Sequence, residues 1–214
     1  MHILSGSFSV VLLGDWNKKY IQPDWVAQYI YKNPEIEIGV EGIGSDFSIS
    51  YRKNSVAFKP TQDKIIISLI NISDDTIKFF SDCVKNYIEE AYTPILTAYG
   101  INIEYTDEEN SRLASVFDEM ADLDPIVNMG YEISATKVSR SLLKNGIIMN
   151  VESTINNSTT RIRFNEHHET ASEDAKSVGN EITPEKMRGF LEETATIIRG
   201  LGYEVDEGGV IEIE

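Results

Sequence analysis

The cluster Glu166-His167-His168-Glu169 is where residue types and spacing in this sequence come closest to metal chemistry. Imidazole nitrogens and carboxylate oxygens both bind divalent transition metals. Residues 161–167 are predicted to form a strand, and neighbouring side chains on a strand point to opposite faces. Glu166 is therefore expected beside His168. His167 then shares the other face with Glu169, so each face offers at most two ligands. A metal site needs further carboxylates from elsewhere, and the spacing matches no known zinc motif.

A second candidate is the glycine-rich stretch that contains Gly39, Gly42 and Gly44, followed by Ser45. It resembles a phosphate-binding loop, but such a loop needs a helix N-terminus directly after it. The residues that follow, 47–51, alternate as a strand, so we interpret the glycines as a turn. The sequence has neither a Walker lysine pattern nor a G-x-S-x-G elbow, and we expect no cofactor.

The single cysteine and a small basic group are interpreted structurally. Cys83 has no cysteine to pair with and no histidine nearby, so it is expected to be a packing residue on a helix. Lys137, Arg140 and Lys144 are expected to share one face of a turn and to form internal salt bridges, rather than a nucleic-acid patch.

Two tryptophans lie close together in Gly14-Asp15-Trp16-Asn17 and Pro23-Asp24-Trp25. Large aromatic side chains this close usually anchor a core. On the rim of a surface they are typical hot spots for a protein partner. Trp16, Trp25, Asp15 and Asp24 are therefore candidate partner-binding residues.

The charge of the chain excludes some classes of partner. Nineteen Lys and Arg against 35 Asp and Glu give a formal charge of -16, which repels phosphate backbones and anionic membranes. Direct nucleic-acid binding is disfavoured. The acidic residues gather in segments 104–124 and 166–214, either as solvated faces or as a surface that meets a basic partner.

The length of 214 residues fits one large domain or two small ones that share a core. The apolar run 8–13 is too short and wrongly flanked for a signal peptide or a membrane span. With one cysteine and no such segment, we expect a cytoplasmic protein that does not bind membranes.

Hydrophobic periodicity predicts the elements of the first half. Strands are expected at 7–13, 35–40, 47–51, 56–58 and 65–70, the last four as an antiparallel meander. A short helix begins at Pro23, and a longer amphipathic helix is capped by Ser73. Gly100 is expected to end that segment, and residues 101–105 to form the next strand.

The second half repeats this order. A helix at 108–122, strands at 131–138, 147–154 and 161–167, a polar loop at 170–181 and a helix from Thr183 are expected, followed by strands at 203–205 and 210–213. The two long helices superpose at a constant offset, with Phe80 on Phe190 and Ile88 on Ile198. The sequence thus predicts an α+β fold of two similar α-β-meander-α-β halves, residues 1–105 and 106–214, with mostly antiparallel sheets and amphipathic helices packed on one face. The repetition suggests an internal duplication, and the halves are compatible with one compact unit.

Four short stretches resemble a sporadically distributed family of uncharacterised bacterial and phage proteins. They are Gly14-Asp15-Trp16, Pro23-Asp24-Trp25, residues 96–102 (LTAYGIN) and residues 163–167 (RFNEH). The resemblance implies a prokaryotic or phage setting near mobile or defence genes, and it supplies no catalytic residues.

Three functional hypotheses follow. The first is a non-enzymatic protein-protein interaction protein: a regulatory, inhibitory or assembly subunit that acts as a homo-oligomer or in a hetero-complex. The second is a metal-dependent hydrolase or nuclease that uses Glu166, His167, His168 and Glu169 as ligands. The third is an acidic nucleic-acid mimic that blocks a DNA-binding enzyme.

Overall fold

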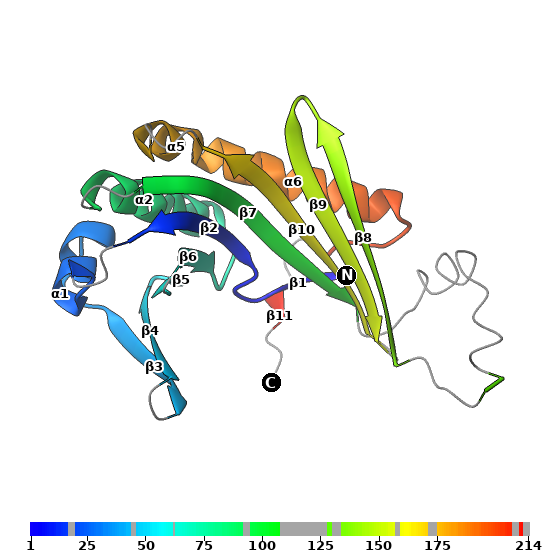
Figure 1. The fold of residues 1–214 in the computed structure, drawn as a ribbon, viewed down its shortest axis with the longest axis horizontal. Coiled ribbons are helices and arrows are strands. Elements are labelled where there is room, and N and C mark those ends of the chain that lie inside the picture. The colour runs from blue at the N-terminus through cyan, green and yellow to red at the C-terminus, as the bar shows by residue number, and fades with distance from the viewer. Residues whose placement is uncertain are drawn as a thin grey trace.

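A computed structural model describes residues 1–16, 20–43, 46–61, 63–91, 95–107, 128–129, 134–156, 159–170, 175–206 and 210–211. In these residues all strands join one sheet of eleven strands, and the helices lie along one of its faces (Figure 1). The fold is α+β with mostly antiparallel pairing, as the alternation in the sequence predicted.

The strands are β1 (His2–Leu4), β2 (Phe8–Asp15), β3 (Glu37–Ile43), β4 (Asp46–Lys53), β5 (Val56–Pro60), β6 (Lys64–Leu69), β7 (Ile95–Asp107), β8 (Ala135–Lys144), β9 (Ile147–Asn156), β10 (Thr159–Glu169) and β11 (Val210–Ile211). The helices are α1 (Pro23–Trp25), which continues as the π-helical η2 (Val26–Ile30), α2 (Asp74–Glu90), α5 (Ala175–Glu181) and α6 (Pro184–Gly200).

The sheet runs in the order β3-β4-β5-β6-β2-β7-β10-β9-β8, and the meander from β3 to β6 is confirmed. Beside this path, β1 pairs antiparallel with β7 and parallel with β11. The predicted division between residues 105 and 106 falls inside β7, which pairs with β2 on one side and with β10 on the other. The two predicted halves therefore share one sheet, and their origin by duplication stays a prediction.

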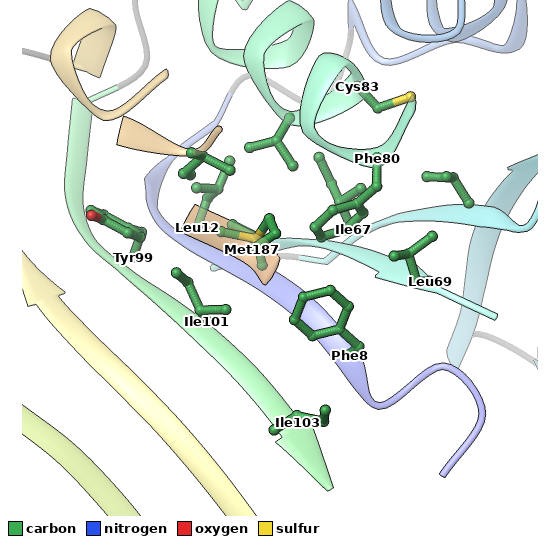
Figure 2. Packing of buried hydrophobic residues seen from close by; sticks show 14 of the residues in the cluster. Phe8, Leu12, Ile67, Leu69, Phe80, Cys83, Tyr99, Ile101, Ile103 and Met187 are labelled. Carbon is green, nitrogen blue, oxygen red and sulfur yellow. The ribbon is translucent and has the colours of Figure 1, made fainter. Parts of the chain in front are cut away.

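The core lies between the sheet and the helices, on what we call the helix face. Alternate residues of β2, among them Phe8 and Leu12, point to this face and are fully buried. The Phe8 ring lies 5.7 Å from Phe80 of α2 (Figure 2). It also lies 6.3 Å from Phe190 of α6, so both long helices pack on the same strand. We call the other side of the sheet the open face, because no described helix packs against it.

Both long helices begin as their sequences predicted. Ser73 caps α2 by accepting a hydrogen bond from the backbone N–H of Thr76 at 3.2 Å, and the Thr76 hydroxyl accepts one from the Ser73 N–H at 2.8 Å. In α6 Thr183 is the cap and Pro184 takes the first turn, where its missing N–H costs nothing. None of the described helices is long and apolar enough to span a membrane.

Gly100 does not end a segment. It lies inside β7, which already begins at Ile95, and a Cβ at this position would stand 2.7 Å from the amide nitrogen Nδ2 of Asn165. Glycine is thus present because the side chain of the neighbouring strand β10 needs the space, a reason that no local pattern contains.

Four other expectations differ from the structure or lie outside it. Gly39 and Gly42, expected in a turn, lie inside β3, and Gly44 and Ser45 lie outside the described residues. Part of the polar loop expected at 170–181 forms α5, which packs on α2 with Val178 buried. Residues 203–205 are not a strand in the structure. The helix expected at 108–122 lies outside the described residues. Cys83 is fully buried on α2, as a packing residue, and burial raises the pKa of its thiol.

Candidate functional site

Strand β10 carries the predicted metal-ligand cluster, and its alternation separates the four side chains as expected. Glu166 and His168 lie on the helix face, where His168 Nε2 is 2.7 Å from a carboxylate oxygen of Glu166. His167 and Glu169 take the alternate positions, on the open face. The structure therefore brings one histidine and one carboxylate of the cluster together.

A lysine from a distant helix completes this pair. Lys186, in the first turn of α6, forms an ion pair with the same Glu166 oxygen that meets His168. Glu166 is only 3% exposed. Burial works to raise the pKa of Glu166, but the hydrogen bonds and positive charges of His168 and Lys186 outweigh it, so the pKa lies below its usual 4.5.

Tyr99 of β7 extends the network from His168 to helix α5. Its ring stacks on His168 with the ring centroids 4.4 Å apart, and its hydroxyl donates to a carboxylate oxygen of Glu181 at 2.7 Å. Burial and the neighbouring Glu181 raise the pKa of Tyr99, so the phenol stays protonated. These contacts join β7, β10, α5 and α6, and their first effect is to hold both helices on the sheet.

The Glu166 network has a cation of its own. Lys186 stands against the carboxylate oxygen that a metal ion would use. Among the described residues, no group of three or more His, Cys, Asp or Glu side chains is close enough to hold a metal. The metal interpretation of the Glu166 to Glu169 cluster stays a prediction, which metal analysis of protein purified without chelator tests.

The predicted partner-binding residues lie at one end of the helix face. Trp16 and Trp25 both meet Tyr87 of α2, with ring centroids 5.4 Å and 6.3 Å away. Asp15 and Asp24 are exposed beside them. The two indoles thus anchor the core, which is the first of the two roles expected from the sequence, and a role of these four residues in partner binding stays a prediction.

The open face carries a row of hydrogen-bonded polar side chains, three amides and one hydroxyl, that crosses four strands. Ser141, Asn150, Asn165 and Asn102 stand opposite one another on β8, β9, β10 and β7. Ser141 Oγ donates to Asn150 Oδ1 at 2.7 Å, and Asn150 Nδ2 donates to Asn165 Oδ1 at 3.4 Å. Asn165 Nδ2 donates to Asn102 Oδ1 at 2.8 Å. We call this row the amide ladder; its members hold one another in place across the sheet.

Next to the amide ladder lies a group of ion pairs around a second buried carboxylate. Glu104 of β7 is 6% exposed, and one of its oxygens accepts hydrogen bonds from Arg163 Nε at 2.9 Å and Nη2 at 2.7 Å. Arg161 Nη1 is 3.8 Å from its other oxygen. Further out, Lys137 of β8 pairs with Glu152 at 2.7 Å, so it is a salt-bridge partner, as predicted. The three basic residues of this strand do not share one face, because Lys137 takes the opposite face from Arg140 and Lys144.

A hollow of about 610 Å³ opens beside the ion pairs around Glu104. It is lined by Leu4, Ser5, Gly6, Arg52, Ala57, Ser68, Ile70 and Arg161. Gly6 has a φ of +71° in the turn between β1 and β2, and nothing stands where its Cβ would be, so the hollow is open at this point. Arg52 and Arg161 bring two guanidinium groups, whose planar forks suit carboxylates, to a chain with a strong negative charge.

Sequence reasoning missed the amide ladder and the hollow. The strand at 161–167 was predicted, and its period of two already places Arg161, Arg163 and Asn165 on one face. Asn102 and Asn150 join them only because of the register between strands far apart in the chain.

A scan against models of known protein families matched none of them, and a search of curated proteins found no similar sequence. The resemblance to a family of bacterial and phage proteins therefore stays a prediction.

Proposed function

We propose that the protein is a non-enzymatic interaction protein of the bacterial or phage cytoplasm, a regulatory, inhibitory or assembly subunit that binds a partner protein through the open face. The observation that supports this is the amide ladder on a sheet face against which no described helix packs. Side chains on a merely solvated face need no fixed arrangement. Here hydrogen bonds hold them in one geometry before any partner arrives, which lowers the entropy cost of binding.

The charge of the chain and the mixed charges of the open face favour a protein as the partner. A chain of formal charge -16 repels nucleic acid, whereas the open face mixes both signs with amide donors and acceptors. Catalysis is not favoured, since Glu104 and Glu166, the two buried carboxylates of the described residues, already have cationic partners. Neither is placed as a free general base.

In this proposal the hollow is the part of the open face that anchors the partner. Arg52 comes from the first predicted half and Arg161 from the second, so the surface depends on both halves being joined in one sheet. The two halves thus contribute to one shared binding face rather than to two separate sites.

The experiment is capture of partners from the native host with tagged protein, followed by titration of the purified partner. A variant with Arg52→Glu and Arg161→Glu reverses both guanidinium charges at exposed positions and is expected to weaken binding about tenfold or more. The control is Lys78→Glu on the exposed side of α2, which makes the same charge change as one of the two arginine substitutions, away from the open face, and should bind as the natural protein does.

One outcome contradicts the proposal directly: the double arginine variant unfolds like the natural protein yet binds the same partner with the same Kd. The salt dependence of binding distinguishes this proposal from the acidic nucleic-acid mimic. The mimic predicts a complex with a DNA-binding enzyme that weakens steeply as salt rises and that is indifferent to the arginine variant.

A further inference from the structure

The sheet ends in two edge strands. Among the described residues β3 pairs only with β4, and β8 pairs only with β9. Figure 1 shows these strands at opposite ends of the sheet. An edge strand presents a row of backbone N–H and C=O groups that another strand can pair with, and proteins normally cover or block such rows.

Exposed apolar side chains gather at these two edges. Eight large apolar side chains of the described residues are exposed: Tyr20, Ile38, Val40, Met129, Leu142, Leu143, Ile148 and Leu201. Five of the eight lie on β3, β8 or β9, and the most exposed of the five are Leu143 at 75% and Val40 at 67%. Apolar side chains next to free backbone groups are typical of a surface that another chain covers.

The two edges carry opposite charges. Residues 33–43, which lead into and form β3, hold three glutamates and no Lys or Arg. Strand β8 holds Lys137, Arg140 and Lys144 and no acidic residue. Two β8 edges placed together repel each other, as do two β3 edges. One β3 edge and one β8 edge attract each other.

The existing ion pairs of β8 do not prevent this pairing. Lys137 pairs with Glu152 and Lys144 with Glu193, but the side chains of the two lysines are 59% and 72% exposed. Pairs this exposed are worth about 0–1 kcal/mol, so their lysines can turn toward new carboxylates at little cost.

We propose that β3 of one copy pairs with β8 of a second copy, so that the sheet continues from one molecule into the next. The contact is head to tail, because each copy offers one edge of each sign. Such contacts build a ring or a longer row of copies rather than a two-fold dimer. The proposal does not depend on the open face, because it uses the ends of the sheet.

The test uses two edge variants and sedimentation velocity over a range of concentrations. The β3 variant carries Ile38→Lys and Val40→Lys, and the β8 variant carries Leu142→Glu and Leu143→Glu. Each places its new charges against an edge of the same sign, so each alone is expected to sediment as a monomer. The natural protein is expected to form oligomers whose mass rises with concentration.

Mixing the two variants is the decisive step. The β3 variant keeps an intact β8, and the β8 variant keeps an intact β3, so a one-to-one mixture should form at least a heterodimer. The control Leu201→Lys changes an exposed apolar side chain at the end of α6 and should keep the oligomers of the natural protein. Circular dichroism checks that each variant folds, and the single changes Val40→Lys and Leu143→Glu serve if a double variant does not.

Three results overturn the proposal: the natural protein sediments as a monomer at every concentration, the β3 variant still associates as the natural protein does, or the one-to-one mixture of the two variants stays monomeric. Each of these results leaves the open-face proposal intact, since that proposal is measured by partner binding.

Discussion

Among the described residues, the sheet buries one carboxylate on each face, and the two are stabilised differently. On the helix face Glu166 meets His168 and Lys186, and the lysine arrives on α6, which also excludes water. On the open face Glu104 meets Arg161 and Arg163 of the adjacent strand. Side-chain exposure is 32% for Lys186 but 45% and 57% for the two arginines.

This difference indicates that the carboxylate group on the helix face has a structural role and that the one on the open face is suited to binding. The pair on the helix face links α6 to the sheet, and its carboxylate is only 3% exposed, which leaves little surface for a ligand. The arginines on the open face satisfy a buried carboxylate while their outer donors remain near water, where a ligand can reach them. A buried carboxylate that meets two nitrogen-bearing side chains therefore serves a different end on each face of the sheet.

The largest expected effect comes from breaking the pair on the helix face. Lys186→Met leaves Glu166 buried with only His168 as its partner, and should lower the free energy of unfolding by about 2–3 kcal/mol. Arg163→Met on the open face should cost about 1 kcal/mol, because Arg161 remains and water reaches the site. Urea unfolding of both variants measures the difference, and equal losses contradict the comparison.

An effect of intermediate size comes from filling the space under the amide ladder. Gly100→Ala places a Cβ 2.7 Å from Asn165 Nδ2 and should cost about 1–3 kcal/mol by overpacking. Adding Asn165→Ala removes the clash, so the double variant should be more stable than the sum of the two single losses predicts. Gly189→Ala is the control, since its Cβ meets nothing within 4 Å in α6 and should be neutral or stabilising. Additive losses would argue against this contact.

The smallest effect is a dependence on acid. The folded pKa of Glu166 lies below its usual 4.5, so its contribution to stability is present above that pH and is lost as the pH falls through the lower folded value. Urea unfolding between about pH 6 and pH 3 should show this loss in the natural protein and a shallower slope in Glu166→Gln. If both proteins lose stability in parallel, the ion pair with Lys186 does not lower the pKa of Glu166.

Much of the local structure follows from the sequence. The apolar run in β2, the alternation in β10, the cap at Ser73 and the apolar stripe of α2 predict those elements within a few residues. The separation of Glu166 and His168 from His167 and Glu169 also follows, because a strand turns successive side chains to opposite faces whatever surrounds it.

Tertiary structure alone decided which side chains meet. The amide ladder depends on the register of β7, β9 and β10, and the Glu166 pair depends on where α6 crosses the sheet. The restriction to glycine at position 100 is also a tertiary effect, since a Cβ there would stand 2.7 Å from Asn165 Nδ2 of another strand. Periodicity and caps act between residues a few positions apart. Register and helix placement depend on contacts between residues tens of positions apart, so a single sequence determines the faces of each element but not which element will cover them.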